Sequence, residues 1–312
     1  MPPSSPVPCL VNIRLHPIKS LDPVFVSEAR ISPSGGLELD RAWALYSVDG
    51  KWVNGKRTPA IHLIRASHSP DLCCVTLSVP GDRRKIPTRT FAFPNGHEDA
   101  AEWFSVFFEQ QIIVRYSENG FPDDSIANGP TIVSTASLQA VSDWFPPTPQ
   151  GFSGISLDEA RERFRATLEI DSCSAERAKF ARPAAFSASA ADSVSDSDSE
   201  SQSDSQPETL PAFWEDQLFG EDERSVVRFR IGEVHFEGSN PCARCPVPPR
   251  NPRTGEELVG FQKRFAQQRQ ATLPPWSPRD RFDHFYRLST NTRVAPTEAG
   301  KLLRLGDPLI LA

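Results

Sequence analysis

Apolar and polar positions alternate in short runs along most of this chain, and such alternation is typical of half-buried β-strands. Thirty prolines and seventeen glycines separate the runs every few residues, which favours turns over long helices. Asp49-Gly50 is a favoured tight-turn pair, so the residues around it predict a hairpin over 42–53. The other predicted strands lie at 10–15, 72–79, 88–93, 112–116, 164–170, 226–236 (two short strands around a turn) and 309–311.

Helical spacing occurs in a few segments between these strands. Ala101, Phe104, Phe107 and Phe108 share one side of the segment 98–110, which predicts an amphipathic helix. Shorter helices are predicted at 137–145, 157–163 and 258–269. The expected fold class is therefore mainly β, with peripheral α-helices.

Two segments have little to bury. Residues 187–209 are mostly serine, aspartate and glutamate, so they predict a disordered insertion. Serines followed by acids within it match the preference of acid-directed kinases, although a tolerated surface insertion is the simpler interpretation. Residues 1–8 predict a proline-rich lead-in, and we expect the fold to begin near Cys9.

Net charge and cysteine spacing indicate which classes of protein and which cellular compartments fit this sequence. The net charge of −6 and the pI of about 5.6 argue against a nucleic-acid-binding protein. No apolar stretch is long enough for a transmembrane helix, and no signal peptide or basic amphipathic presequence opens the chain. The six cysteines are irregularly spaced, so we expect free thiols in a reducing compartment. The expected location is the cytoplasm, with association with mitochondria left open.

The segment Asn240-Pro241-Cys242-Ala243-Arg244-Cys245-Pro246 places two thiols beside an arginine. Its prolines predict a rigid loop that is neither helix nor central strand. Arg244 next to Cys245 favours the thiolate, the form that binds metal or attacks. Residue types alone leave three interpretations open: an ordinary packed or paired thiol, half of a zinc site, and a functional sulfur on Cys245.

Three motifs together resemble the MOSC-domain proteins, the family that includes the amidoxime-reducing components and the C-terminal part of molybdenum cofactor sulfurases. The resemblance spans nearly the whole chain outside the lead-in and the insertion. The chain departs from the family in having Pro248 and Pro249 where threonines are frequent, and Asn251 where an acid is usual. The motifs are Cys242-Ala243-Arg244-Cys245 with Asn251-Pro252-Arg253-Thr254-Gly255, His16-Pro17-Ile18-Lys19-Ser20, and Gly36-Leu37-Glu38-Leu39-Asp40-Arg41-Ala42-Trp43.

The resemblance implies a molybdenum cofactor (molybdopterin), with Cys245 as the sulfur ligand of the metal and as the catalytic residue. Cys242 is then a neighbour without an assigned role. The residues that the resemblance assigns to cofactor binding are Lys19, Ser20, Arg41, Lys56, Arg57, Ser134, Ser137, Arg165 and Arg244. Cations and hydroxyls suit the cofactor's phosphate. Without the resemblance, most of them are surface charges or an Asp40–Arg41 ion pair, and Ser137 serves equally well as a helix N-cap.

The resemblance also implies an architecture and an activity. Residues 9–118 would form an N-terminal MOSC-associated β domain and residues 119–312 a MOSC-type β-barrel, with the cofactor in the cleft between them. The activity would be the reduction of small N-hydroxylated substrates such as amidoximes and hydroxylamines. Because the chain has no flavin or haem signature, electrons would come from an external donor, in the family a b-type cytochrome and its flavoprotein reductase.

Two other functions fit parts of the same pattern. A non-catalytic protein could carry the molybdenum cofactor or sulfur, as in cofactor sulfurases, although those proteins also have a pyridoxal-phosphate-binding domain for which 312 residues are too few. A thiol redox protein could use Cys242 and Cys245, but no thioredoxin-like βαβ pattern surrounds them.

Overall fold

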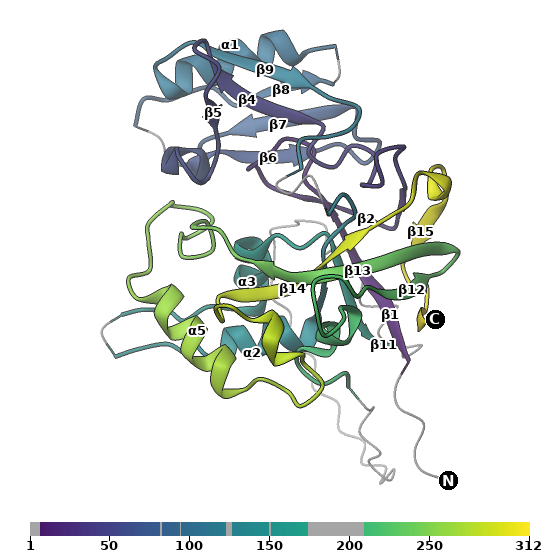
Figure 1. The fold of residues 1–312 in the computed structure, drawn as a ribbon. Helices are drawn as coiled ribbons and strands as arrows, with labels where there is room; N and C mark the ends of the chain where they lie inside the picture. Colours follow the sequence, from purple (N-terminus) through teal and green to yellow (C-terminus); the bar gives the residue numbers. More distant parts are fainter. Residues whose placement is uncertain (1–6, 82, 94, 123–126, 150, 174–208) are drawn as a thin grey trace, which may run out of the picture.

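The computed structural model describes residues 7–81, 83–93, 95–122, 127–149, 151–173 and 209–312. β-Strands take up more of this chain than helices do, which confirms the mainly β fold expected from the sequence. Figure 1 shows two lobes, one above the other. We call the described residues among 43–116 the upper lobe, and the described residues among 8–15, 24–30 and 132–311 the lower lobe; residues 16–23 and 31–42 connect the two lobes.

One eight-stranded sheet organises the lower lobe, in the order β16-β12-β13-β14-β10-β11-β1-β2. All neighbours are antiparallel except β10 and β11, which are parallel. A short pair, β3 (Glu28–Arg30) with β15 (Leu302–Arg304), lies beside it. The strands of the large sheet are β1 (Pro8–Leu15), β2 (Val24–Val26), β10 (Ile132–Ser134), β11 (Leu168–Ser172), β12 (Val227–Ile231), β13 (Val234–Ala243), β14 (Arg287–Arg293) and β16 (Leu309–Leu311).

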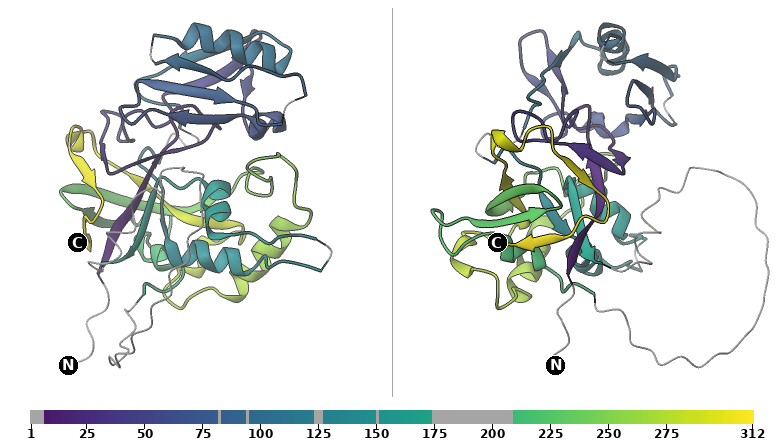
Figure 2. Two further views of the ribbon diagram at one scale, coloured as in Figure 1. Left: turned by 180° about the vertical axis from the view of Figure 1, so that it is seen from behind. Right: turned by 90° about the vertical axis from the view of Figure 1, so that its right-hand side faces the viewer.

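The large sheet curls until its two ends meet. The backbone N–H of Leu10 in β1 donates to the carbonyl of Asp307 at 2.9 Å, and Gly306 N–H donates to the carbonyl of Leu10 at 2.7 Å. Figure 2 shows the yellow C-terminal strand beside the purple β1. The strand order itself remains open, but its concave side encloses a core of fully buried side chains that includes Leu10, Ile13 and Phe229.

The upper lobe holds two small antiparallel sheets and one helix around a separate apolar core. The sheets have the orders β5-β4-β9 and β6-β7-β8, and α1 (His97–Phe108) packs over them (Figure 1). Trp43, Trp103 and Phe104 are at most 3% exposed within this core. The strands are β4 (Trp43–Ser47), β5 (Trp52–Val53), β6 (Arg65–His68), β7 (Cys74–Ser78), β8 (Arg89–Ala92) and β9 (Ile112–Tyr116), and a 3₁₀ turn, η1 (Pro59–Leu63), precedes β6.

Three helices pack against the lower lobe's sheet through aromatic side chains. They are α2 (Thr135–Asp143), α3 (Leu157–Phe164) and α5 (Phe261–Ala271), and Arg269 of α5 pairs with Asp216 of a 3₁₀ turn, η2 (Trp214–Leu218). Phe261 and Phe265 are one helical turn apart, and both are buried against Phe164 of α3. This packing fixes the C-terminal end of α3, which lies at the pocket described below.

The expectation that residues 240–250 avoid a central strand is wrong for their first part. β13 runs through Pro241 and Cys242 to Ala243, between β12 and β14. Proline is tolerated there because the pairing with β14 is irregular on both sides of it, so no ladder hydrogen bond needs its missing N–H. Only the residues after Ala243 form a loop. The strand expected at 164–170 is also shifted, to 168–172, because α3 continues to Phe164.

Parts of the predicted lead-in and insertion lie outside the residues that the structure describes. Residues 187–208 of the insertion and residues 1–6 of the lead-in lie outside the described residues. Pro8, placed in the lead-in, already belongs to β1. Within the described chain, none of the helices combines the length and the apolar character needed to cross a bilayer. The division into domains at residue 118 stays a prediction; by hydrogen bonding, β1 to β3 lie with the lower lobe.

A buried polar cluster beneath α5 should make stability depend on pH. Glu215 is completely buried, and burial and then the neighbouring Asp216 raise the pKa of its carboxyl to about 7. The folded protein therefore holds a proton that the unfolded chain releases near pH 4.5, so this group's contribution falls as the pH rises from about 4.5 to 7.

We expect Glu215→Gln to remove that loss, because a neutral amide replaces the carboxyl. From pH 5 to pH 8 the wild type should lose up to about 3 kcal/mol more stability than the variant, measured as the difference in urea unfolding free energy at each pH. Comparing the two proteins cancels the opposite contribution of buried histidines such as His16, whose pKa is lowered by burial to about 3. An equal pH dependence in both proteins would show that Glu215 is ionised in the fold.

Candidate functional site

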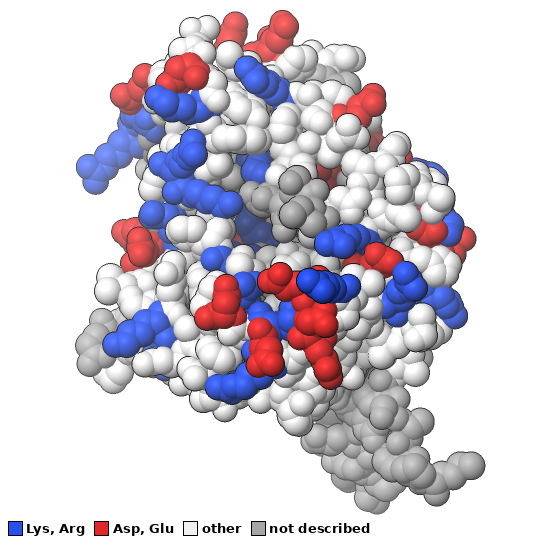
Figure 3. Space-filling view, in the orientation of Figure 1, with Lys and Arg blue, Asp and Glu red and all other residues white. Residues whose placement is uncertain are grey.

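A pocket of about 510 Å³ lies between the two lobes, a volume in the range of small-molecule sites. The upper side is contributed by the segment from Lys19 to Arg41 and by residues 54–62. The lower side is contributed by the end of α3, the loop after β13, and β14. Figure 3 shows Lys and Arg side chains within the hollow between the lobes.

The end of β13 and the loop after it bring the two cysteines of the motif to this pocket. Cys242 is the penultimate residue of the strand, Cys245 follows in the loop, and both are partly exposed. The Arg244 guanidinium donates to Cys242 Sγ at 3.2 Å and to the carbonyl of Phe164, and lies over the Phe164 ring. The sulfur that Arg244 contacts is thus that of Cys242, whereas the sequence led us to expect Cys245.

We call residues 244–255, which follow β13, the cysteine loop. Arg163 in α3 holds the rest of this loop, and the sequence did not identify Arg163 as a site residue. Its Nη1 donates to the carbonyls of Pro248 at 2.7 Å and Arg250 at 2.8 Å. Its other guanidinium nitrogens bind Glu159, and the residue is only 3% exposed. In the run Arg161-Glu162-Arg163 nothing in the sequence distinguishes the buried arginine from its neighbours.

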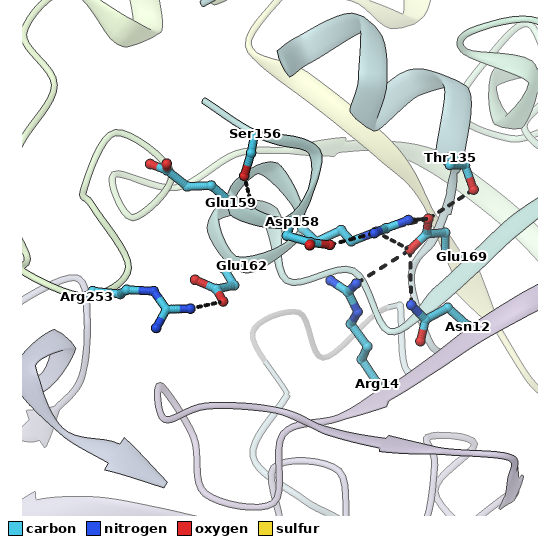
Figure 4. Close-up of polar contacts among 10 residues, drawn as sticks. Asn12, Arg14, Thr135, Ser156, Asp158, Glu159, Glu162, Glu169 and Arg253 are labelled. Atoms are coloured by element: carbon cyan, nitrogen blue, oxygen red, sulfur yellow. Dashed lines mark hydrogen bonds and ion pairs between the residues drawn. The ribbon is translucent and has the colours of Figure 1, made fainter. Parts of the chain in front are cut away.

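Ion pairs anchor α3 on two further sides (Figure 4). Arg161 binds both oxygens of the buried Glu169 in β11, and Arg253 from the cysteine loop binds Glu162 at 2.9 Å. Glu169 is also approached by Arg14, Asn12 and Thr135. Because the helix is fixed to the sheet and the loop is fixed to the helix, the cysteines have a rigid support.

Arg165 reaches the pocket directly after α3 because the backbone turns sharply there. It caps the helix in the left-handed conformation with φ of 53°, and its Nη2 donates to the carbonyl of Leu21 at 2.8 Å. Ser20 and Arg41, both pocket residues, also have positive φ, at 74° and 53°. Such backbone costs about 1–2 kcal/mol per non-glycine residue, and observed strain of this kind clusters at functional sites.

The upper side of the pocket collects the basic residues expected from the sequence. Lys19 Nζ donates to the carbonyl of Phe121 at 2.7 Å and is 8% exposed, and Ser20 Oγ accepts from Gly55 N–H at 3.1 Å. Arg41 pairs with Asp40, and Lys56 lines the same wall. Burial opposes the charge on Asp40, but Arg41 and His16 outweigh it and lower the pKa of the carboxyl to about 2. The Asp40–Arg41 ion pair therefore exists, and it lies within the pocket.

Three expected residues do not line this pocket. Arg57 is exposed at the turn around Asn54. Ser134 and Ser137 are completely buried at the start of α2, where Ser137 Oγ donates to Glu215 at 2.8 Å. The N-cap is Ser134, whose Oγ accepts from Ser137 N–H, so the suggestion that Ser137 is the cap is wrong by one helical turn.

The structure adds three uncharged pocket residues that sequence analysis did not single out. His62 is 7% exposed, and burial followed by Arg165 lowers the pKa of its imidazole to about 4, so it is neutral at pH 7. Asn240 and Asn291 lie on neighbouring strands at the lower side. A histidine between Ile61 and Leu63 and asparagines in polar stretches carry no sequence signal of a site.

The donor set of the pocket suits an anion together with a soft metal better than a closed zinc site. Among its described residues are six cations, Lys19, Arg41, Lys56, Arg163, Arg165 and Arg244, and a single carboxylate, Asp40. In the described parts of the chain no three His, Cys, Asp or Glu residues gather as metal ligands, so Cys245 could supply only one of several ligands. A metal bound here would need further donors from a cofactor.

Comparison with known proteins agrees with this geometry. Residues 7–111, which include Lys19, Ser20, Arg41 and Lys56, match the family model of the MOSC N-terminal beta barrel domain. The chain carries a MOSC N-terminal domain. Its resemblance to MOSC-domain proteins is thereby confirmed.

A curated relative extends the comparison. Mitochondrial amidoxime reducing component 2 of Bos taurus is 28% identical over 137 residues, covering 35% of this chain and 40% of the relative. The chain thus matches about two fifths of that protein's length. In this chain the upper wall of the pocket comes from the MOSC N-terminal domain and the cysteine loop from beyond it.

Proposed function

We propose that this protein is a molybdenum-cofactor-dependent oxidoreductase that reduces N-hydroxylated compounds such as amidoximes and hydroxylamines. One observation carries the proposal: six cationic side chains and a partly exposed thiol share one pocket in a chain whose net charge is −6. The match to the MOSC N-terminal domain and the likeness to an amidoxime reducing component support the same activity.

The chain's residues divide into two groups for this role. Lys19, Ser20, Arg41, Lys56 and Arg165 would hold the anionic phosphate of the pterin cofactor. Cys245 would bind molybdenum, whose preference for sulfur matches a cysteine thiolate beside a dithiolene. The bound cofactor would supply two-electron transfer at the metal. Arg57, Ser134 and Ser137 lie outside the pocket lining and are not part of this proposal.

The residues of this chain would position the metal ligand and shield the reacting centre from water. Arg163 and Arg253 keep the cysteine loop on α3, and the pocket between the lobes limits the access of water to the reacting centre. Electrons would come from an external donor, a b-type cytochrome with its flavoprotein reductase. We further propose a cytoplasmic location, with mitochondrial association left open by the relative's name.

The test is the metal and pterin content of the protein produced in a host that makes molybdenum cofactor. We expect about one molybdenum and one pterin per chain, and reduction of benzamidoxime with an artificial electron donor such as reduced methyl viologen. Cofactor without turnover would favour the carrier alternative. Zinc alone, or neither metal nor pterin, would refute both.

A further inference from the structure

Asn240 and Asn291 form a pair of amides on the lower side of the pocket. They are register partners on β13 and β14, so their Cβ atoms are roughly 5 Å apart on one face of the sheet. Both line the pocket, and β13 carries Asn240 two residues before Cys242. The pair therefore lies beside the cysteine loop, across from the basic upper wall.

These amides have hydrogen-bonding capacity that the described protein does not use. Asn291 is 7% exposed, and no hydrogen bond of its side chain is found among the described residues. Asn240 Oδ1 accepts from Ser239 Oγ at 2.8 Å, which leaves its Nδ2 donors without a protein partner there. By contrast, the amide of the pocket residue Asn128 is taken up by Ser34 and Val294. The unpartnered polar atoms of both amides are not enclosed by protein and both residues line the pocket, so a ligand bound there can reach them.

We propose that Asn240 and Asn291 bind the planar edge of an amide or amidine, a group with adjacent N–H donors and N or O acceptors. The inference rests on the proposed function, because two ligands of that function have such an edge: the pyrimidine ring of the pterin and an amidoxime substrate. A carboxamide presents both an acceptor and two donors, and asparagine uses them as a pair to bind such edges of nucleobases.

Charge separates this pair from the rest of the pocket. The six cations suit a phosphate, whereas the two neutral amides neither attract nor repel an uncharged heterocycle. Because a carboxamide edge discriminates by geometry, loss of one amide should cost about tenfold in affinity for a ligand with the matching edge. It should cost little for a ligand that lacks this edge.

The experiment compares wild type, Asn291→Leu and Asn291→Asp, the last of which keeps the size and loses the N–H donors. Asn119→Leu is the matched control, because Asn119 is an exposed amide at the pocket lining. Each protein is produced in the cofactor-making host. Molybdenum and pterin per chain are measured, followed by the KM for benzamidoxime and for phenylhydroxylamine, which has no amidine edge.

The outcomes show whether the two asparagines bind the pterin or the substrate. If the pterin is bound, cofactor content falls in both Asn291 variants but not in Asn119→Leu, and the KM of the loaded fraction is unchanged. If the substrate is bound, content is unchanged and only the KM for benzamidoxime rises about tenfold. Unchanged content together with unchanged KM values, or an equal change in Asn119→Leu, would overturn the proposal.

A direct binding measurement keeps this test apart from the test of the proposed function. If the wild type contains no cofactor and has no turnover, the proposed function fails. Benzamidoxime and 6-hydroxymethylpterin, both uncharged at pH 7, are then titrated calorimetrically into wild type and both Asn291 variants. Binding of either probe that is about tenfold weaker in the variants supports the amide site, whereas equal binding, or no binding by the wild type, contradicts it.

Discussion

Replacing Cys245 by serine is expected to lower benzamidoxime reduction by at least about 100-fold. Loss of a residue that merely supports a metal ligand costs about 10–100-fold, and loss of the ligand itself should cost no less. A serine oxygen is a harder donor than the thiolate, so molybdenum should also be retained less well. The measurements are turnover with reduced methyl viologen and molybdenum per chain.

Cys242→Ser is the matched control, because it changes the same atom three residues away in the same pocket. Cys242 Sγ accepts from Arg244 at 3.2 Å, and a serine hydroxyl can accept from the same guanidinium. We therefore expect its activity to stay within about tenfold of the wild type. Equal losses in both variants would instead point to a Cys242–Cys245 thiol redox pair, and full activity in Cys245→Ser would remove Cys245 from the site.

Arg163→Met is expected to destabilise the protein and loosen the cysteine loop. The substitution keeps much of the side chain's length but removes its hydrogen bonds to Pro248 and Arg250 and its contact with Glu159. Removing one partner of a buried charged network costs about 3–5 kcal/mol, which for a chain of this size lowers Tm by roughly 6–20 °C. Thermal unfolding followed by circular dichroism measures this directly.

The loosening of the loop has its own readout and control. A thiol reagent should modify Cys245 faster in Arg163→Met than in the wild type under native conditions, because the loop opens more often. Arg253→Met is the comparison, since Arg253 is exposed and its pair with Glu162 is worth about 1 kcal/mol or less. Similar Tm values for the two variants would show that Arg163 does not hold the loop.

The apolar strands and the N-terminal part of the site could be predicted from the sequence, for a clear physical reason. Strands such as β9 and β7 bury alternate side chains, so their pattern is visible in the residues themselves. Lys19 and Arg41 were found through short motifs whose spacing is local. The pocket brings both beside the cysteine loop, more than 200 residues further along the chain.

Strand β14 shows why other parts of the fold and of the pocket could not be predicted from the sequence. Its sequence, Arg-Leu-Ser-Thr-Asn-Thr-Arg, is polar and resembles a loop, yet it is a central strand with five buried residues. The hydroxyls of Thr290 and Thr292 donate to the carbonyls of Glu215 and Pro130, segments distant in sequence. Because long-range hydrogen bonds satisfy these polar groups, hydrophobic patterning gives no sign of the strand or of Asn291 within it.

Arg165 illustrates a different limit. The sequence placed it within a strand, whereas it ends α3 in a left-handed conformation. That conformation is unfavourable for arginine by itself and is held by packing of α3 and by the hydrogen bond to Leu21. Local propensity therefore predicts the wrong backbone at the very residue that reaches the pocket.

The curling of the large sheet has a consequence for how this chain is made. β1 lies at the N-terminus, but its partners are β11, about 160 residues later, and Asp307, near the end of the chain. At about 5–20 residues per second, a ribosome needs roughly 15–60 s between these points. During that time the apolar face of β1, with Leu10 and Ile13, has no native partner from the C-terminal end. We therefore expect nascent chains to bind chaperones through β1 until residues 306 and 307 have been made.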